Sequence, residues 1–219
     1  MSVQKPKPTI GCLALQGAVD LHRPHIEACG AVFRAVKTPA DFDAVDGFIL
    51  PGGESTTMLR LIDVFGLWES LQSNFAHKPV WGICAGTILI AQNVLVNDNL
   101  SSRDQKSDQK DTQKSFNLLP ISVLRNGYGT QLESRHTEIS GYTVSFIRAP
   151  VIQAVSVQDN KTENSEIEVL AEYDGAPVWV QGKGTQAKYM ASTFHPELTQ
   201  VYPSPMHQKF VDLVSSAAQ

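Results

Sequence analysis

The sequence predicts an α/β protein built as a three-layer sandwich, with a mostly parallel central sheet flanked by helices. In the first half, short and almost wholly apolar runs alternate with stretches whose apolar residues recur every three or four positions. Buried parallel strands joined by amphipathic helices produce this pattern. The second half contains strand-like runs joined by turns, so we expect antiparallel additions in the C-terminal half.

Four strands and three helices are expected in the first half. The helix over 55–75 has the clearest pattern, because its apolar residues are spaced by three and four, and Gly66 is a candidate break. Gly30 follows the first helix and is a typical helix stop. The expected strands cover 9–15, 31–37, 45–53 and 78–84, and the expected helices cover 20–29, 55–75 and 85–94.

The second half is expected to consist mainly of strands followed by one helix. Asp174-Gly175 lies between two β-rich runs and indicates a hairpin turn. Ser204-Pro205 is a typical N-cap and first helical residue, and the helix should continue to about residue 215. The expected strands lie at 118–126, 143–150, 167–181 and 189–194.

Residues 97–115 differ from the rest of the chain. They include four positive and four negative charges, and Leu100 is their only large apolar side chain. Such a segment buries too little surface to offset the entropy of ordering it, so a disordered insert is favoured over a functional lid. All other segments follow one pattern, and we expect a single domain over residues 1–219.

Composition excludes several classes of partner. Of 219 residues, 42% are hydrophobic, and 18 basic against 22 acidic residues give a net charge of −4. This balance does not suit nucleic acid or an anionic membrane surface. The start has no apolar core of a secretory signal, and Gly82 and Gly86 interrupt the uncharged run 79–97. We therefore expect a cytoplasmic protein without membrane or nucleic-acid partners.

The cysteines and histidines do not suggest a metal site. Three cysteines are an odd number without any C-x-x-C spacing, which does not suit a disulfide framework or a zinc knuckle. His22 and His25 are one turn apart on a helix that we expect near the surface, and the other histidines show no H-E-x-x-H pattern. Cys12 and Cys29 are expected to be core residues.

Cys84 is the first residue whose surroundings suggest chemistry. It lies in Gly82-Ile83-Cys84-Ala85-Gly86, between an expected strand and an expected helix. Glycines on both sides permit the sharp turn of a nucleophile elbow, and a helix N-terminus favours a thiolate. The alternative is a buried core cysteine, which is the usual fate of this residue type.

His195 and Glu197 form a second candidate pair. They are two residues apart on an extended segment, and Pro196 between them opposes a helix. A carboxylate beside an imidazole orients the ring and stabilises its protonated form. A salt bridge at the end of a strand is the structural alternative.

The third signal is the segment 51–57, with sequence PGGESTT. Gly52 and Gly53 follow a strand, so that backbone N–H groups can face an anion or an oxyanion. It can also be a strand-to-helix turn with Ser55 as the N-cap. Together, the three signals supply a nucleophile, a base with an orienting carboxylate, and an oxyanion hole.

GICAG, PGGEST and FHPEL, in this order, resemble the class I, Cys-His-Glu type glutamine amidotransferases. Within this class, LALQGAVDLH, DGFILPGGESTTM, KPVWGICAGTILIA, RNGYGTQ, FIRAP and STFHPELT resemble the glutaminase subunit of pyridoxal 5′-phosphate synthase. The resemblance runs from Thr9 to about Phe210, apart from the insert and residues 153–166. Within RNGYG, Gly127 and Tyr128 depart from the family, which more often has a small polar residue and Phe there, and residues 134–141 do not align.

The resemblance implies roles for individual residues. By position, Cys84 is the nucleophile, and His195 and Glu197 complete the triad. The N–H groups of Gly53 and Ala85 are the expected oxyanion donors. The implied glutamine-binding residues are Gly53, Glu54, Ser55, Arg125, Ile147 and Arg148. No cofactor and no metal are implied.

The implied reaction is hydrolysis of L-glutamine to glutamate and ammonia through a cysteine thioester. The ammonia acceptor would be a pyridoxal 5′-phosphate synthase subunit in a hetero-oligomeric complex, since one amidotransferase domain fills 219 residues. A glutaminase of another biosynthetic complex, such as that of the histidine pathway, is the first alternative, which the LQG start and PGGESTT oppose. A non-catalytic relative is the second, which the complete set of three chemical groups opposes.

Overall fold

The computed structural model describes residues 6–96, 113–125, 135–155 and 166–217. Its centre is a seven-stranded sheet in the order β10-β11-β12-β4-β3-β1-β2. Five neighbouring strands are parallel: β2 (Val32–Val36), β1 (Thr9–Leu13), β3 (Gly47–Leu50), β4 (Val80–Ile83) and β12 (Tyr189–Ser192). β11 (Ala176–Gly182) and β10 (Ile167–Tyr173) extend the sheet in the antiparallel sense. The predicted fold class is confirmed.

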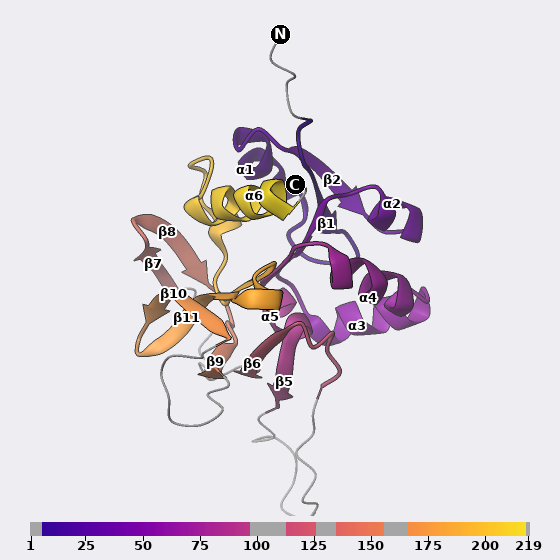
Figure 1. Cartoon of the computed structure of the whole chain (residues 1–219). Coiled ribbons are helices and arrows are strands. Elements are labelled where there is room, and N and C mark those ends of the chain that lie inside the picture. Colours follow the sequence, from indigo (N-terminus) through magenta and orange to yellow (C-terminus); the bar gives the residue numbers. More distant parts are fainter. Residues whose placement is uncertain (1–5, 97–112, 126–134, 156–165, 218–219) are drawn as a thin grey trace, which may run out of the picture.

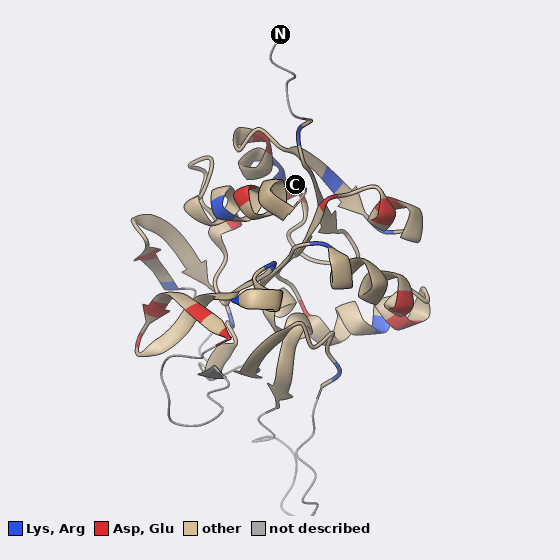
Figure 2. Ribbon diagram, viewed as in Figure 1, with Lys and Arg blue, Asp and Glu red and all other residues tan. Residues whose placement is uncertain are grey.

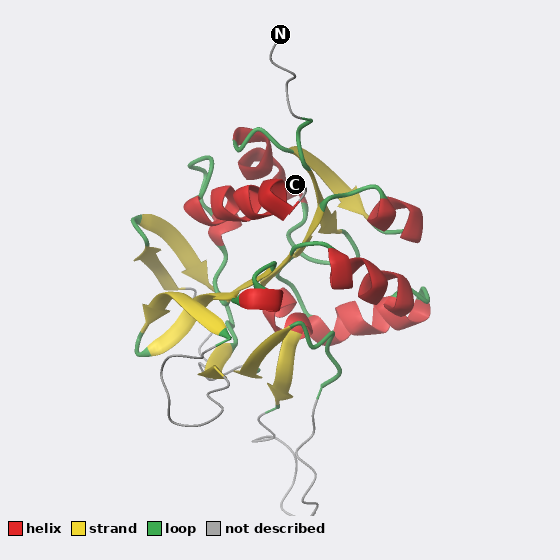
Figure 3. Ribbon diagram, viewed as in Figure 1, coloured by secondary structure: helices red, strands yellow, loops and turns green. Residues whose placement is uncertain are grey.

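Helices cover both faces of this sheet (Figures 1 and 3). Helices α1 (Arg23–Ala28) and α6 (Pro205–Ala217) contribute to one buried core. The 3₁₀ helix η1 (Asp20–His22) contacts α1. The other core contains residues of α2 (Pro39–Asp43), α3 (Ser55–Val64), α4 (Trp68–His77) and α5 (Ala85–Ile90). Successive residues of a strand point to opposite faces, so Phe48 and Leu50 enter one core and Ile49 the other.

Two smaller sheets adjoin the central one. β5 (Ala91–Leu95) pairs in parallel with β6 (Leu119–Leu124), which pairs antiparallel with β9 (Val151–Val155). β7 (Arg135–Ile139) and β8 (Tyr142–Phe146) form a hairpin. The remaining 3₁₀ helices are η2 (Gly184–Gln186) and η3 (Pro196–Leu198).

Turn chemistry accounts for several predicted boundaries. Asp174 and Gly175 both have positive φ, as a two-residue hairpin turn requires, and join β10 to β11 as predicted. Gly66, at φ 63°, ends α3, and the Leu67 N–H bonds the Ile62 carbonyl oxygen across the break. The candidate break in the helix over 55–75 is therefore real. At the start of α6, the Ser204 hydroxyl oxygen caps the helix by accepting the backbone N–H of His207 at 3.2 Å.

The sequence patterns were wrong or silent at other places. The helix predicted over 85–94 ends at Ile90, because Ala91 turns to an extended backbone and begins β5. The first helix begins as the 3₁₀ turn η1, and β1 ends at Leu13 rather than residue 15. α2 was not predicted, although Thr38 and Asp41 form a capping box.

Part of the predicted insert lies outside the described residues, namely 97–112. The last three residues of the predicted insert, 113–115, are described and contact the folded body. Lys114 lies 3.6 Å above the Trp68 ring, and the hydroxyl of Ser115 bonds the Ala91 carbonyl oxygen at 2.6 Å. Acidic and basic positions are interspersed along the described elements (Figure 2). None of the described helices reaches the length and apolarity needed to cross a bilayer.

Two phenylalanines test the packing of the core. Phe48 is fully buried between Phe42 and Phe75, with edge-to-face ring contacts to both, whereas Phe65 is 60% exposed. We expect Phe48→Ala to lower the free energy of unfolding by about 3–5 kcal/mol. Phe65→Ala should change it by less than about 0.5 kcal/mol. Urea denaturation of both variants measures the difference, and equal losses would contradict the assigned core.

Candidate active site

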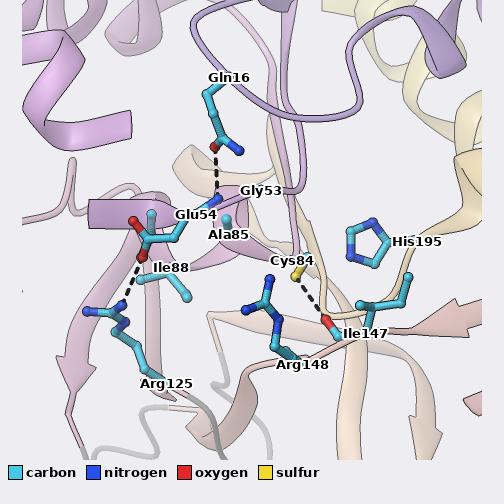
Figure 4. Close-up of a pocket in the computed structure, with 11 residues that line it drawn as sticks. Gln16, Gly53, Glu54, Cys84, Ala85, Ile88, Arg125, Ile147, Arg148 and His195 are labelled. Atoms are coloured by element: carbon cyan, nitrogen blue, oxygen red, sulfur yellow. Dashed lines mark hydrogen bonds and ion pairs between the residues drawn. The ribbon is translucent and has the colours of Figure 1, made fainter. Parts of the chain in front are cut away.

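The candidate site lies beyond the carboxyl ends of β1, β3 and β4, which is where open α/β sheets bind ligands. A pocket of about 330 Å³ opens there (Figure 4). Its lining includes every predicted site residue except Glu197. The lining residues are Gln16, Gly53, Glu54, Ser55, Cys84, Ala85, Ile88, Arg125, Ile147, Arg148 and His195.

Cys84 lies at the sharp turn from β4 into α5, as the elbow interpretation predicted. Its backbone has φ 49° and ψ −104°, an arrangement that is unusual and strained for a residue with a side chain. Close packing explains the flanking glycines: a Cβ on Gly82 would come within 2.5 Å of the Gly86 carbonyl oxygen, and one on Gly86 within 2.0 Å of the Leu50 carbonyl oxygen. Cys84 is 6% exposed and belongs to the core, and it also lines the pocket.

His195 and Glu197 are joined by a buried hydrogen bond. Nδ1 of His195 lies 2.7 Å from Oε1 of Glu197, whose side chain is fully enclosed. The backbone of His195 pairs with Ser145 of β8, through bonds of 2.8 and 3.3 Å. Gly52 makes room for the ring, because a Cβ there would lie 2.2 Å from Cε1 of His195. This pair is therefore not the surface salt bridge considered as the alternative.

The His195 imidazole shares the pocket with the Cys84 sulfur (Figure 4). Burial lowers the pKa of His195, but interactions with the side chains of Cys84 and Glu197 outweigh it and raise the pKa to about 10. Burial raises the pKa of Glu197, yet the bond from His195 and the charges around it bring that pKa below its ordinary value. In this conformation the Cys84 thiol donates to the Ile147 carbonyl oxygen, with Sγ 3.9 Å away.

The glycine-rich loop between β3 and α3 contributes backbone and charge to the pocket. Glu54, not Ser55, caps α3, because its carboxylate accepts the N–H groups of Thr56 and Thr57 at 3.3 and 2.6 Å. Burial alone would raise the pKa of Glu54, but these bonds and the Thr56 hydroxyl lower it to about 2. Ser55 is the first residue of the helix and is 2% exposed.

Three further predicted residues complete the pocket wall. A guanidinium nitrogen of Arg125 lies 3.2 Å from a carboxylate oxygen of Glu54. Ile147 and Arg148 follow β8, and Arg148 has a positive φ of 45°. The rest of the RNGYG motif, residues 126–129, lies outside the described residues. The pocket thus carries two guanidinium groups and one carboxylate beside the Cys84 sulfur.

Gln16 and Ile88 line the pocket but were not predicted as site residues. Oε1 of Gln16 accepts the Glu54 N–H at 2.8 Å and lies 2.4 Å from where a Cβ of Gly53 would be. A signal for Gln16 existed, since it follows a buried strand at the edge of the sheet that carries the other site residues. Ile88 had no such signal, because an apolar helical residue is indistinguishable from a core residue in the sequence.

His22 and His25 were predicted near the surface, and this was wrong. Both are buried between the sheet and α6, next to His207. Cys12 is fully buried as expected, whereas Cys29 is only partly buried. No group of three metal-ligating side chains occurs in the part of the chain that the structure describes.

The pocket combines a cysteine at a strand-to-helix turn, a buried His-Glu pair and a glycine-rich loop, as predicted for a glutamine amidotransferase. A solved structure described as a glutamine amidotransferase covers 94% of this chain with a TM-score of 0.74, 29% sequence identity and 98% coverage of its own length. The family model of the SNO glutamine amidotransferase family matches residues 12–216. The chain belongs to this family.

Two relatives are similar over nearly their whole length. "Pyridoxal 5′-phosphate synthase subunit PdxT" of Geobacillus sp. (strain WCH70) is 40% identical over 215 residues, covering 95% of this chain and 97% of the relative. The protein of the same name from Deinococcus radiodurans is 38% identical over 217 residues, covering 96% and 99%. A putative GMP synthase subunit from Thermoplasma acidophilum has the same fold, with a TM-score of 0.57 and 15% identity.

The His195–Glu197 pair predicts a measurable titration. Glu197→Gln replaces the carboxylate by a neutral group of similar shape, so the pKa of His195 should fall from about 10. A raised folded-state pKa stabilises the protein fully below the unfolded value of about 6.5, and this stabilisation is lost as pH rises through the folded value. The stability difference between wild type and Glu197→Gln should therefore shrink from pH 7 to pH 10.

Ring-proton chemical shifts of His195 followed against pH measure the titration directly. Chemical denaturation at several pH values measures the stability difference. His77→Gln is the control, since it changes a histidine that lies outside this pair. An unchanged His195 titration in Glu197→Gln would contradict the assigned ion pair.

Proposed function

We propose that this chain hydrolyses L-glutamine to L-glutamate and ammonia through a Cys84 thioester. It would do so as the glutaminase subunit of a pyridoxal 5′-phosphate synthase. The observation that carries the chemistry is the position of Cys84 at a strained strand-to-helix turn, in a pocket shared with an imidazole that a buried carboxylate holds. We also propose that residues 1–219 form one amidotransferase domain and that the protein is cytoplasmic.

The first step needs a thiolate and a polarised amide. The Cys84 sulfur attacks the side-chain carbonyl carbon of glutamine, forming a C–S bond and a tetrahedral oxyanion. The N–H groups of Ala85, which begins α5, and of Gly53 are the proposed oxyanion donors. Loss of one such donor typically costs about 3 kcal/mol of transition-state stabilisation.

His195 then acts as a general acid and afterwards as a base. Its protonated ring donates to the amide nitrogen while the C–N bond breaks, so that ammonia leaves instead of the amide anion. Water next attacks the thioester carbon, the ring accepts a proton from the water, and the C–S bond breaks to release glutamate and the thiolate. Glu197 stabilises the imidazolium and fixes the ring orientation throughout.

The charges of the pocket suit the two ends of an amino acid. Arg125 and Arg148 offer guanidinium groups to an α-carboxylate, and the negative charge of Glu54, ionised above a pKa of about 2, favours an α-ammonium group in the same pocket. Ser55 and Ile147 line the same space. This arrangement supports binding of glutamine with its side-chain amide directed at Cys84.

The partner is proposed from the relatives. Those at about 40% identity bear the name pyridoxal 5′-phosphate synthase subunit PdxT, which supports a separate synthase subunit as the ammonia acceptor. A glutaminase of another complex, such as that of the histidine pathway, is not favoured by these relatives. We expect weak glutaminase activity of the isolated chain and activation in the hetero-oligomeric complex.

The nucleophile assignment predicts the effect of Cys84→Ala. In the presence of the synthase subunit, this variant should release glutamate at least about 1,000-fold more slowly than wild type, because no thioester can form. Cys29→Ala removes a partly buried thiol outside the pocket and should keep wild-type activity. Glutamate is measured over time from purified proteins. An inactive wild-type complex would refute the proposed function, and an active Cys84→Ala would refute the nucleophile.

The binding role of Arg125 predicts a change in KM. Arg125→Met keeps the length of the side chain but removes its charge, so KM for glutamine should rise about 10- to 100-fold, as expected for one charged hydrogen bond. The value of kcat should change less. Arg60→Met alters an exposed arginine of α3 and serves as the matched control. Steady-state kinetics of the complex with both variants test this, and an unchanged KM would remove Arg125 from the binding site.

A further inference from the structure

Three buried histidines lie against the face of the sheet opposite α3 to α5. His22 ends η1, His25 belongs to α1 and His207 belongs to α6, and we call them the histidine cluster. The rings of His25 and His207 stack at 4.3 Å with an angle of 6°. The catalytic proposal above uses none of the three, yet buried polar side chains of this kind are costly unless they are hydrogen-bonded.

Hydrogen bonds connect Ser204, His207 and His22 in a chain. The Ser204 hydroxyl oxygen accepts the His207 backbone N–H at 3.2 Å and lies 2.6 Å from Nδ1 of the same histidine. Nε2 of His207 lies 2.9 Å from Nδ1 of His22. If the Ser204 hydroxyl donates to His207 Nδ1, then His207 Nε2–H donates to His22 Nδ1, and the proton of neutral His22 is on Nε2.

This chain of hydrogen bonds ends at His22, on an element that contacts the one carrying Glu197 of the proposed triad. Nε2 of His22 and Oε2 of Glu197 are both buried, and within the described residues neither has a hydrogen-bond partner. The two residues lie in η1 and η3, which pack against each other. Oε1 of Glu197 is already bonded to His195. A nitrogen and a carboxylate oxygen without partners thus remain on two elements that contact each other, and a buried carboxylate requires such a donor.

The protonation states agree with this order. Burial lowers the pKa of His22 to about 4, although Glu197 acts in the opposite direction. Burial and the neighbouring histidines lower the pKa of His207 well below its ordinary value. Both rings are therefore neutral at pH 7, so each has one N–H donor and one acceptor nitrogen, as a directed chain of bonds needs.

We propose that His22 is a positioning residue for Glu197, donating its Nε2–H to Oε2 of the carboxylate. With His195 on Oε1 and His22 on Oε2, the carboxylate cannot rotate about its terminal bond, and the imidazole of His195 keeps the orientation that proton transfer to and from the substrate requires. Ser204 and His207 select the His22 tautomer. The inference rests on the proposed function, because it assigns Glu197 to the triad.

Other titratable groups also face Glu197 and are accounted for. Burial lowers the pKa of His25, whereas a bond to the Glu197 backbone and the charge of Glu197 act in the opposite direction. Nδ1 of His25 accepts the Ser204 backbone N–H at 3.1 Å. Cys12 of β1 is fully buried, and burial together with the charge of Glu197 raises its pKa well above the ordinary value. Cys12 therefore stays a neutral thiol. His22 and His25 both have an Nε2 atom without a partner in the described part of the chain, but of the two only His22 is among the groups that lower the pKa of Glu197.

The tautomer of His22 tests the inference in the wild-type protein. Long-range proton–nitrogen correlation spectra distinguish Nε2–H from Nδ1–H imidazoles. We expect neutral Nε2–H tautomers for His22 and His207 at pH 7. A His22 proton on Nδ1 contradicts the proposal. This measurement requires no turnover, so it is decisive even if the chain proves not to be a glutaminase.

Variants of His22 test the effect on the reaction in the complex with the synthase subunit. His22→Leu should lower kcat about 10-fold with little change in KM, and should lower the pKa of His195. His22→Gln retains an N–H donor and a carbonyl acceptor, and should restore most of kcat and of the His195 titration. If His22→Leu fails to fold, His22→Gln and the tautomer measurement still test the proposed bond from His22 to Glu197.

Trp81→Phe is the matched control for packing. The Trp81 ring makes edge contacts with both His22 and His207, but its indole N–H bonds the Ser192 hydroxyl, not Glu197. This variant should lose stability while the His195 titration stays as in wild type. Wild-type kcat and an unchanged His195 pKa in His22→Leu would overturn the proposal, as would a loss in His22→Leu that His22→Gln does not reverse. An inactive wild-type complex would instead refute the proposed function.

Discussion

The positive φ of Cys84 is the constraint on which the rest of the site depends. Holding a residue with a side chain in this conformation costs about 1–3 kcal/mol, so the surroundings must enforce it. The Cys84 N–H bonds the Ser192 carbonyl oxygen at 2.8 Å, and the Thr87 hydroxyl bonds that same oxygen and the Gly82 carbonyl oxygen. Since β12 ends at Ser192 and His195 follows three residues later in the chain, the bonds that position the sulfur also position the imidazole.

The buried charge of Glu197 limits how many of the histidines near it can be protonated. Desolvation opposes ionisation of this carboxylate, and the bond to His195 reverses the effect. One carboxylate can neutralise one imidazolium, so additional protonated histidines nearby would be unfavourable. The low pKa of His22 and His207, to which the other histidines contribute, satisfies this condition. The proton is therefore held at His195, the ring that faces the pocket.

Some site residues could be predicted from the sequence, because their neighbours in the chain already determine the local backbone geometry. The glycines around Cys84 and the proline between His195 and Glu197 act over a few residues, and the structure has the elbow and the His-Glu bond expected from them. Ile88 and the histidine cluster could not be found in this way, because their surroundings come from distant segments. His22 and His207 are 185 residues apart. Two histidines spaced by three residues, such as His22 and His25, look the same in the sequence whether solvent or another helix covers them.

The loop between β3 and α3 has two roles, which cannot be distinguished in the motif PGGEST. Glu54 caps α3 and also pairs with Arg125, so the helix end and the charge of the pocket depend on one carboxylate. The Gln16 side chain holds the Glu54 N–H and packs against Gly53, whose own N–H is the proposed oxyanion donor. A side chain at Gly53 would displace Gln16, and this in turn would release Glu54. The glycine is therefore needed for the contact between the ends of β1 and β3 as well as for access to the oxyanion.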